Sequence, residues 1–318
     1  MKRVLITDDT HPILQQRLKE AGFEVKVNTT YDVNGLLAII GEYDALVVRS
    51  KIEIDKFFID KARNLKCIGR VGAGMETIDV EYAKVFGIRC VNSPEGNRNA
   101  VGEHTVGLLL SLMNNIARAD AEVRRGLWQR EANRGLELGC RTVGIIGFGN
   151  MGASFARCLQ GFGCRILAYD KYKKDYAPDY VEETTMEQLR QEADIVSLHV
   201  PLTDETHHMV DASFLGCFAK PIMLLNTSRG AVVDTPALVS AMKNGLVAGA
   251  ALDVIEYEKM TTDGLDLARL PEAFRYLIES PNVVLTPHVA GWTVESKYKL
   301  AAVLADKIID VLKPDPSK

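Results

Sequence analysis

The chain has 318 residues, more than a usual single domain of roughly 100–200 residues, so its length predicts two domains. Its hydrophobic content of 47% is enough for substantial cores, and its formal net charge of −4 argues against nucleic acid or an anionic membrane as the main partner. No apolar stretch has membrane-spanning length, and the N-terminus has no signal-peptide core. The six cysteines contain no C-x-x-C pair, so we expect buried free thiols in a cytoplasmic protein.

The N-terminal part of the chain, from Val4 to about Val91, alternates short β-branched runs with amphipathic segments. This alternation predicts an α/β block with a largely parallel sheet. Its strands are expected at Val4–Ile6, Phe23–Val27, Ala45–Val48, Lys66–Ile68 and Ile88–Val91. A longer apolar helix at 100–113 then leads into a polar stretch at 114–139.

An apolar run, Val143–Ile146, leads into the turn Gly147-Phe148-Gly149-Asn150-Met151-Gly152, followed by a helix, a second strand at Arg165–Tyr169 and then Asp170. Glycines in such a unit permit a tight turn and close approach of the backbone to a pyrophosphate, whose charge is attracted by N–H groups at the helix start. A carboxylate about 20 residues further on binds a ribose 2′-hydroxyl and repels a 2′-phosphate. The unit therefore predicts a dinucleotide site that takes NAD rather than NADP. The alternative is a turn without a ligand.

Six strands are expected in this second block: Val143–Ile146, Arg165–Tyr169, Asp194–Leu198, Met223–Leu225, Val247–Leu252 and Val283–Leu285. They fit a doubly wound sheet in the order 3-2-1-4-5-6, with ligands outside the carboxyl ends of the strands. This count places Asp170 on the adenine side, together with His199, His207 and His208 after the third strand. The final helix, Lys297–Leu312, then has to pack on the N-terminal block, which makes that block discontinuous.

Residues after the fourth, fifth and sixth strands should face the nicotinamide: Arg229, Glu258 and His288. Oxidation of a hydroxyl by hydride loss needs a base, and His288 suits this because the pKa of histidine lies near operating pH. Glu258 would orient the ring and favour its protonated form, and Arg229 would bind a carboxylate or polarise a carbonyl. The alternatives are a helix-capping Arg229, a solvated Glu258 and a structural His288. His104 is expected to be packed and hydrogen-bonded, and no cluster has the spacing of a metal site.

Six motifs follow one another along the chain: Val71-Gly72-Ala73-Gly74, Ala100-Val101-Gly102-Glu103-His104, the glycine turn, Leu225-Asn226-Thr227-Ser228-Arg229-Gly230, Gly249-Ala250-Ala251-Leu252-Asp253-Val254 and Thr286-Pro287-His288. Together they resemble the D-isomer-specific 2-hydroxyacid dehydrogenases. The resemblance implies a Rossmann NAD-binding domain at 100–286, inserted into a flavodoxin-like α/β substrate domain formed by 1–99 and 287–318. It also implies an active site in the cleft between the domains and a homodimer held through the 100–139 region.

The resemblance also implies which residues carry the function. The catalytic trio falls on Arg229, Glu258 and His288, and Asp253 would lie near the nicotinamide carboxamide. NAD contacts fall on Gly147, Gly149, Asn150, Met151, Gly152, Asp170, His199, Pro201, Thr206, Thr227, Ser228, Asp253 and Gly291. Substrate contacts fall on Arg49, Ser50, Lys51, Arg70, Ala73, Gly74 and Asn97, where Ala73 and Gly74 form the turn that binds the carboxylate.

Within the family, Val48-Arg49-Ser50-Lys51, Gly69-Arg70-Val71-Gly72 and Asn92–Asn97 look most like 3-phosphoglycerate dehydrogenases. Cations at Arg49, Lys51 and Arg70 would bind the phosphate, and solvated loop charges are the alternative. Other candidates are a glyoxylate or hydroxypyruvate reductase, a D-lactate dehydrogenase and, from another class, an NAD-sensing corepressor-like binding protein. Room is lacking for the C-terminal regulatory domain of some phosphoglycerate dehydrogenases, so serine feedback through such a domain is not expected.

The sequence departs from the family pattern in two places. The turn usually written Asp-Asn before Ile-Asp reads Glu76-Thr77-Ile78-Asp79. The proline that usually follows the catalytic glutamate is Lys259, and the segment Met260–Glu279 looks longer than usual. Glu256 is therefore the second candidate for the catalytic glutamate. Trp292 is expected either to close the mouth of the pocket or to pack at the hinge.

Overall fold

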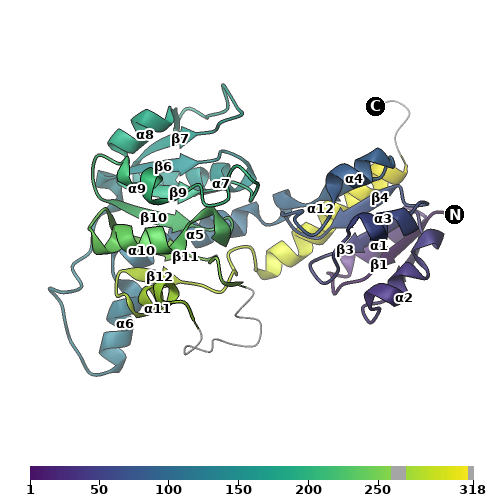
Figure 1. Ribbon diagram of the computed structural model, residues 1–318, viewed down its shortest axis with the longest axis horizontal. Coiled ribbons are helices and arrows are strands. Elements are labelled where there is room, and N and C mark those ends of the chain that lie inside the picture. Colours follow the sequence, from purple (N-terminus) through teal and green to yellow (C-terminus); the bar gives the residue numbers. More distant parts are fainter. Residues whose placement is uncertain (259–269, 314–318) are drawn as a thin grey trace. The chain divides into compact units, whose positions relative to one another are not determined.

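The computed structural model of the protein describes residues 1–258 and 270–313, and the chain divides into two compact units. The first unit comprises Met1–Arg98 and Trp292–Lys318, and the second comprises Asn99–Gly291. The sequence predicts boundaries at 99/100 and 286/287. Each unit is built around its own parallel sheet (Figure 1).

The sheet of the first unit has five parallel strands in the order β2-β1-β3-β4-β5, which is the flavodoxin-like order. Apolar residues fill its central strands because both faces of a parallel sheet are buried. The strands are β1 (Arg3–Ile6), β2 (Glu24–Val27), β3 (Ala45–Val48), β4 (Cys67–Arg70) and β5 (Arg89–Asn92). The helical segments are α1 (Ile13–Glu20), α2 (Val33–Leu37), η1 (Ile40–Glu42), α3 (Lys56–Lys61), α4 (Val80–Val85), η2 (Pro94–Gly96) and α12 (Val294–Leu312).

The last helix, α12, completes the core of the first unit. Leu300, Leu304 and Ile308 recur at helical spacing, and each is buried against apolar side chains of β1 and α1. The helix begins with a capping box, in which the Ser296 N–H donates to Thr293 Oγ1 at 3.0 Å and the Thr293 N–H donates to Ser296 Oγ at 2.9 Å. The prediction that the final helix returns to the N-terminal block is confirmed.

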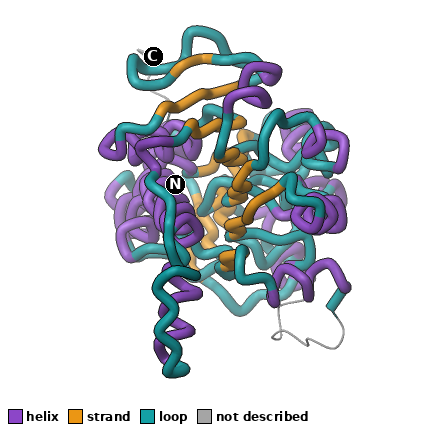
Figure 2. Tube along the Cα trace, turned by 90° about the vertical axis from the view of Figure 1, so that its left-hand side faces the viewer, coloured by secondary structure: helices purple, strands orange, loops and turns teal. Residues whose placement is uncertain are grey.

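The sheet of the second unit has seven parallel strands in the order β12-β11-β10-β9-β6-β7-β8, and Figure 2 shows helices on both sides of it. The strands are β6 (Thr142–Ile146), β7 (Arg165–Tyr169), β8 (Glu182–Glu183), β9 (Ile195–Leu198), β10 (Ile222–Asn226), β11 (Val247–Leu252) and β12 (Val283–Leu285). The helical segments are α5 (Arg98–Met113), α6 (Ile116–Arg124), η3 (Leu138–Cys140), α7 (Asn150–Leu159), η4 (Gln160–Phe162), α8 (Met186–Glu192), α9 (Ala212–Gly216), η5 (Gly230–Val232), α10 (Thr235–Lys243) and α11 (Glu272–Glu279).

The prediction of six strands in the second unit is wrong, because a seventh strand, β8, pairs with β7 at the edge of the sheet. It consists of two exposed glutamates, so it lacks the apolar residues by which a buried strand is recognised. With β8 counted third, β9 becomes the fourth strand, and it pairs with β6 on the side opposite β7. The count that placed His199, His207 and His208 on the β7 side is therefore wrong, since all three follow β9.

The cysteines depart in part from the prediction drawn from composition. All six are free, and Cys67 is buried. The expectation of buried thiols is wrong for Cys140 and Cys217, which are exposed because they lie where a 3-10 turn and helix α9 end at the surface. Within residues 1–258 and 270–313, no helix is long and apolar enough to cross a membrane.

Candidate active site

The glycine-rich turn joins β6 to α7 and is tightly folded, with open space at Gly149. Gly147 has a φ of +90°, which L side chains rarely adopt, and a Cβ at Gly152 would lie 2.1 Å from the Gly147 carbonyl oxygen. Around Gly149, no described atom beyond its chain neighbours lies within 4 Å of the Cβ position. Among the residues that the structure describes, no side chain caps the start of α7. The backbone N–H groups there fit the pyrophosphate of NAD.

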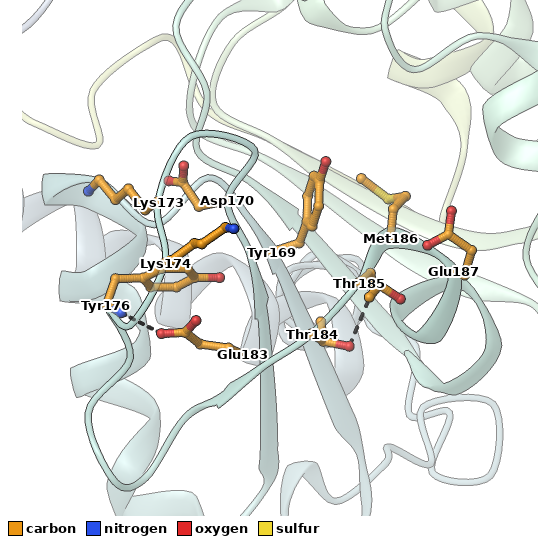
Figure 3. A pocket seen from close by; sticks show the side chains of 10 residues that line it. All are labelled: Tyr169, Asp170, Lys173, Lys174, Tyr176, Glu183, Thr184, Thr185, Met186 and Glu187. Carbon is orange, nitrogen blue, oxygen red and sulfur yellow. Dashed lines mark hydrogen bonds between the residues drawn. The ribbon is translucent and has the colours of Figure 1, made fainter.

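Asp170 follows β7, the strand paired with β6, and so lies beside the glycine turn. Its carboxylate accepts hydrogen bonds from the backbone N–H groups of Phe148 at 2.9 Å and Tyr172 at 3.0 Å. The ammonium of Lys173 donates to the Phe148 carbonyl at 2.7 Å. A pocket of about 410 Å³ extends from Asp170 toward β8 and α8, lined by Tyr169, Asp170, Lys173, Lys174, Tyr176, Glu183, Thr184, Thr185, Met186 and Glu187 (Figure 3).

His288 lies after β12 and faces Glu258, which lies after β11. His288 Nδ1 and Glu258 Oε2 are 2.9 Å apart. A carboxylate only accepts hydrogen bonds, so Nδ1 donates and Nε2 is the nitrogen that a substrate can meet. The hydrogen bond with Glu258 raises the pKa of His288, against the opposing effects of burial and of the Arg229 charge. The pair can therefore take up a proton and return it.

Asp253 holds the segment that carries His288. Its carboxylate is buried and accepts hydrogen bonds from the N–H groups of residues 289 and 290, both at 2.9 Å, and from Thr286 Oγ1 at 2.6 Å. Its carbonyl accepts from the His288 N–H at 2.7 Å. Burial alone would raise the pKa of Asp253, but the hydrogen bonds that it accepts outweigh this effect and lower the pKa. These contacts hold His288 at a φ of +55°, a left-handed conformation that is uncommon for histidine.

His104, in α5, belongs to the same network. Its Nε2 lies 3.1 Å from Thr286 Oγ1 and 3.5 Å from Asp253 Oδ1. The expectation of a packed, hydrogen-bonded residue is confirmed.

The predicted contact between Asp253 and the nicotinamide carboxamide stays a prediction.

Arg229 lies in the loop after β10, and this loop is fixed from within. The side-chain amide of Asn226 donates to the Arg229 carbonyl at 2.9 Å, and its oxygen accepts from the Ser228 N–H at 3.0 Å. Arg229 Nη1 donates to the Ser228 carbonyl at 2.7 Å. Arg229 stands at the N-cap position of η5, but its side chain makes no capping hydrogen bond there, and the side chain of Asp234 caps α10.

The loops that carry Arg229 and Glu258 touch through their backbones. A Cβ at Gly230 would lie 2.0 Å from the carbonyl oxygen of Ile255, so only glycine fits. Arg229, Glu258 and His288 thus follow the adjacent strands β10, β11 and β12 of one unit, as the sequence predicts. Their catalytic roles stay a prediction.

The other predicted NAD contacts shape the loops after β9 and β10. Thr206 Oγ1 donates to the Pro201 carbonyl at 2.6 Å. Thr227 and Ser228 are buried, and Thr227 Oγ1 lies 3.1 Å from Thr105 Oγ1. Asn150 and Met151 begin α7, and Gly291 is the last residue of the second unit.

His199 is a buried residue at the end of β9. Its Nε2 lies 2.8 Å from Ser197 Oγ, and its ring lies 5.4 Å from the Phe155 ring. Its Nδ1 is buried without a hydrogen-bond partner among the described residues. Burial lowers the pKa of His199 to about 3, so the ring is neutral. These surroundings suit a structural role.

The neutral ring of His199 should make folding stability depend on pH. Its pKa is about 3 in the folded protein and 6.5 in a model peptide, so between these values the unfolded state binds more protons. The free energy of unfolding should therefore fall as the pH falls, by about 2 kcal/mol between roughly pH 7 and pH 5. Denaturant unfolding at both pH values measures the slope, and His199→Asn should lack this part of it. An equal slope in the variant would contradict the prediction.

The predicted phosphate contacts lie at the carboxyl ends of β3 and β4 in the first unit. Arg70 Nε donates to the carbonyl of Arg49 at 3.2 Å. The guanidinium carbon of Arg49 lies 4.6 Å from the centroid of the Trp292 ring, a cation–π contact. Lys51, beyond Ser50, instead donates to the Thr29 carbonyl at 2.8 Å. The structure thus links Arg49 with Arg70 and ties the Lys51 ammonium to another loop.

The other predicted substrate contacts lie in turns of the first unit. Ala73 and Gly74 follow β4, and the Ala73 carbonyl accepts from Asn92 Nδ2 at 2.5 Å. Asn97 follows η2, and its Oδ1 is buried with no hydrogen-bond partner within the part of the chain that is described. A buried, unpaired oxygen costs free energy, so a donor from a ligand or water would stabilise this position.

Sequence reasoning missed contacts between distant loops. Thr286 joins Asp253 to His104. Glu256, the second candidate for the catalytic glutamate, lies against His208 Nε2 at 2.6 Å, and it is Glu258 that faces His288. No motif in the sequence signals either contact.

Among the described residues, no group of three or more His, Cys, Asp or Glu side chains could hold a metal ion. Lys259 and the first part of the segment that looks longer than usual, up to residue 269, lie outside the described residues. Its last part forms α11.

Comparisons with known proteins complete the description of the site. The family model described as "D-isomer specific 2-hydroxyacid dehydrogenase, NAD binding domain" matches residues 106–290. The chain is 36% identical over 316 residues to the D-3-phosphoglycerate dehydrogenase of Methanocaldococcus jannaschii, and the alignment covers 98% of this chain and 58% of that protein. It is 38% identical over 279 residues to the hydroxypyruvate reductase of Thermotoga maritima, and this alignment covers 87% of each protein.

A solved structure is also similar to this chain over nearly its whole length. The D-lactate dehydrogenase of Aquifex aeolicus, complexed with NAD and lactic acid, matches with a TM-score of 0.82 at 28% identity and covers 99% of this chain and 97% of that one. The chain thus spans nearly the whole length of the D-lactate dehydrogenase but only 58% of the length of the phosphoglycerate dehydrogenase.

Proposed function

The chain belongs to the D-isomer-specific 2-hydroxyacid dehydrogenase family, and from this premise we propose that it interconverts a D-2-hydroxy acid and its 2-oxo acid with NAD. The observation that carries the proposal is the 2.9 Å contact between His288 Nδ1 and Glu258 Oε2. This pair follows two strands of the same parallel sheet whose β6 leads into the glycine turn. A proton acceptor and a dinucleotide turn at one edge of a sheet suit hydride transfer.

NAD, when bound, supplies the hydride acceptor of the oxidation. His288 Nε2 accepts the proton of the substrate hydroxyl, and Glu258 stabilises the imidazolium that results. In the reverse direction the same nitrogen donates that proton to the carbonyl oxygen. Arg229 binds the substrate carboxylate and polarises the adjacent carbonyl, for which a planar, two-pronged cation is suited.

We infer that the substrate is 3-phosphoglycerate. Support comes from the phosphoglycerate dehydrogenase relative and from Arg49 and Arg70, two cations at the ends of adjacent strands, where the Arg70 guanidinium donates to the backbone carbonyl of Arg49. Guanidinium groups suit a phosphate. A phosphoglycerate substrate places the reaction in serine biosynthesis. Hydroxypyruvate is the second candidate, because the reductase relative aligns over 87% of its length. The free thiols of all six cysteines support a cytoplasmic location.

A substrate panel tests this function. We expect NAD reduction with 3-phosphoglycerate and slower reaction with D-glycerate and D-lactate, which lack the phosphate. In the reverse direction, hydroxypyruvate and glyoxylate are offered with NADH and with NADPH. Faster reduction of hydroxypyruvate than of 3-phosphohydroxypyruvate, offered in the same direction, would favour the reductase. NADH binding without turnover of any member would contradict the enzyme and favour an NAD-sensing binding protein.

Asp170 should set the preference for NAD over NADP, because its carboxylate repels a 2′-phosphate. Asp170→Asn keeps an acceptor for the Phe148 N–H but removes the charge. The ratio of kcat/KM with NAD to kcat/KM with NADP should fall by about tenfold or more, which corresponds to about 1.4 kcal/mol. Glu187→Gln, in the same pocket, is the matched control. A ratio that Asp170→Asn leaves unchanged would contradict the assignment.

We also infer a homodimer held through the 100–139 region. Helix α6 has no buried residue, and it projects from the sheet of its own unit in Figures 1 and 2. Ile116, Val123 and Trp128 are 54%, 50% and 78% exposed. A second copy that covers these side chains would remove apolar surface from water, at roughly 25 cal/mol per Å².

The double substitution Val123→Asp with Trp128→Asp should therefore give a monomer in sedimentation experiments at a concentration at which the wild type is a dimer. Charged groups cannot be buried in an apolar interface without a partner. Val85→Asp, at a residue that is 77% exposed in the first unit, is the control and should leave the dimer intact. A dimer that persists in the double variant would place the interface elsewhere.

A further inference from the structure

A second histidine–carboxylate pair lies near the proposed catalytic trio and takes no part in the proposed proton transfer. His208 Nε2 lies 2.6 Å from Glu256 Oε1. The backbone N–H and the hydroxyl of Thr235 donate to Glu256 Oε2 at 3.1 Å and 2.7 Å. Both carboxylate oxygens of Glu256 therefore have partners, and the side chain is only 18% exposed, so the cluster is largely buried.

This cluster joins three loops of the second unit. His208 follows β9, Thr235 begins α10, and Glu256 lies in the loop after β11, just before Glu258. The His208 N–H also donates to the carbonyl of Ala231, just beyond Arg229, at 2.8 Å. His208 therefore contacts the Arg229 loop through its backbone and the Glu258 loop through its ring.

The backbone of His208 has a φ of +50°, which is uncommon for a residue other than glycine and costs free energy. Such a conformation persists where the surrounding contacts determine it. Here these contacts are the hydrogen bond to Ala231, the contact with Glu256 and the stacked ring of His207, whose centroid lies 4.1 Å away.

The position of Glu258 depends on the backbone that this cluster holds. The N–H of Ile255 donates to Glu258 Oε1 at 3.3 Å, while Oε2 faces His288. The carbonyl of the same residue, Ile255, packs against Gly230 of the Arg229 loop. A shift of the loop at Glu256 would therefore move the carboxylate away from His288.

We propose that His208 and Glu256 are positioning residues, whose contact holds the loop that presents Glu258 to His288. The inference rests on the proposed function, because it acts through the support that Glu258 gives to His288. Misplacement of a catalytic group by about 1 Å is enough to lower a rate by roughly 100-fold, so a contact between loops can control turnover without touching substrate.

A double-mutant cycle tests the inference on the full chain. Glu256→Gln and His208→Asn are made in the wild type and in Glu258→Gln. Asn suits the left-handed backbone of position 208 but is too short to reach Glu256. In the wild type each substitution should lower kcat by about tenfold, and in Glu258→Gln by less than about twofold, because the group being positioned is gone. The Kd of NADH should stay within about twofold of the wild-type value.

Two further variants separate positioning from general damage. His208→Gln, whose amide can donate to Glu256, should recover most of the lost turnover. Asp204→Asn, exposed in the same loop, is the matched control and should behave as wild type. If Glu256→Gln fails to bind NADH or unfolds early, His208→Asn with its Gln rescue decides the question.

Equal losses of kcat in both backgrounds, or no loss in either, would overturn the inference. So would a His208→Gln variant as slow as His208→Asn. These outcomes differ from failure of the proposed function itself, in which the wild type turns over no member of the substrate panel.

Discussion

Replacement of His288 by Asn should lower kcat by about 10³-fold in both directions and leave the Kd of NADH within about twofold of the wild-type value. The variant removes the nitrogen that accepts and donates the substrate proton. Asn is the suitable replacement because it tolerates the left-handed backbone, and position 288 has a φ of +55°. Initial rates with the best substrate of the panel measure the effect, and Asp204→Asn, at an exposed residue of the loop after β9, is the control.

The dependence of turnover on pH provides a second test of the role of His288. Oxidation needs neutral His288, whereas reduction needs the protonated ring. The hydrogen bond with Glu258 raises the pKa of His288 above 6.5, the ordinary value of histidine. Oxidation should therefore rise with pH through a range above 6.5, and reduction should fall through the same range. His288→Asn should abolish both the rise of oxidation and the fall of reduction with pH. If these pH dependences persist in the variant, another group transfers the substrate proton.

The parts of the fold that follow from local sequence patterns could be predicted. An apolar strand, a turn that requires glycine and an amphipathic helix are recognisable in one short stretch, so β6, the glycine turn and α7 were predictable together. The return of α12 to the first unit was predictable because no further strand of the second unit remained to be covered. β8 was not, because an edge strand of two glutamates carries no apolar pattern.

The candidate site could be predicted as far as topology determines it. Arg229, Glu258 and His288 follow three successive strands, and parallel strands bring their carboxyl ends to one edge. Contacts between loops were beyond reach, because they depend on backbone conformation at single residues. The sequence offered Glu258 as the first candidate and Glu256 as the second, and only the contacts of Glu258 with His288 and of Glu256 with His208 separate them.

Arg229→Lys should lower kcat/KM by about 10²–10³-fold, the cost of losing a well-placed donor to developing charge. Arg229 Nη1 donates to the Ser228 carbonyl at 2.7 Å, so the loop fixes the plane of the guanidinium and the direction of its other N–H groups. An ammonium keeps the charge but not this planar fork. If Arg229 mainly binds the carboxylate, KM should rise; if it mainly polarises the carbonyl, kcat should fall. A Lys variant with wild-type kcat/KM would contradict both roles.

Comparison of Arg229→Lys with Arg229→Ala separates the charge of this residue from its shape. The positive charge of Arg229 opposes protonation of His288 and so lowers its pKa, against the larger effect of the hydrogen bond with Glu258. Loss of that charge in the Ala variant should raise the pKa of His288 and move the rise of oxidation to higher pH, whereas Lys should leave it nearly in place. An unmoved limb in the Ala variant would mean that the charge of Arg229 does not act on His288. If the pH dependence of oxidation moves only in the Ala variant while turnover is low in both variants, the charge of Arg229 acts on the pKa of His288 and its planar guanidinium acts on the rate.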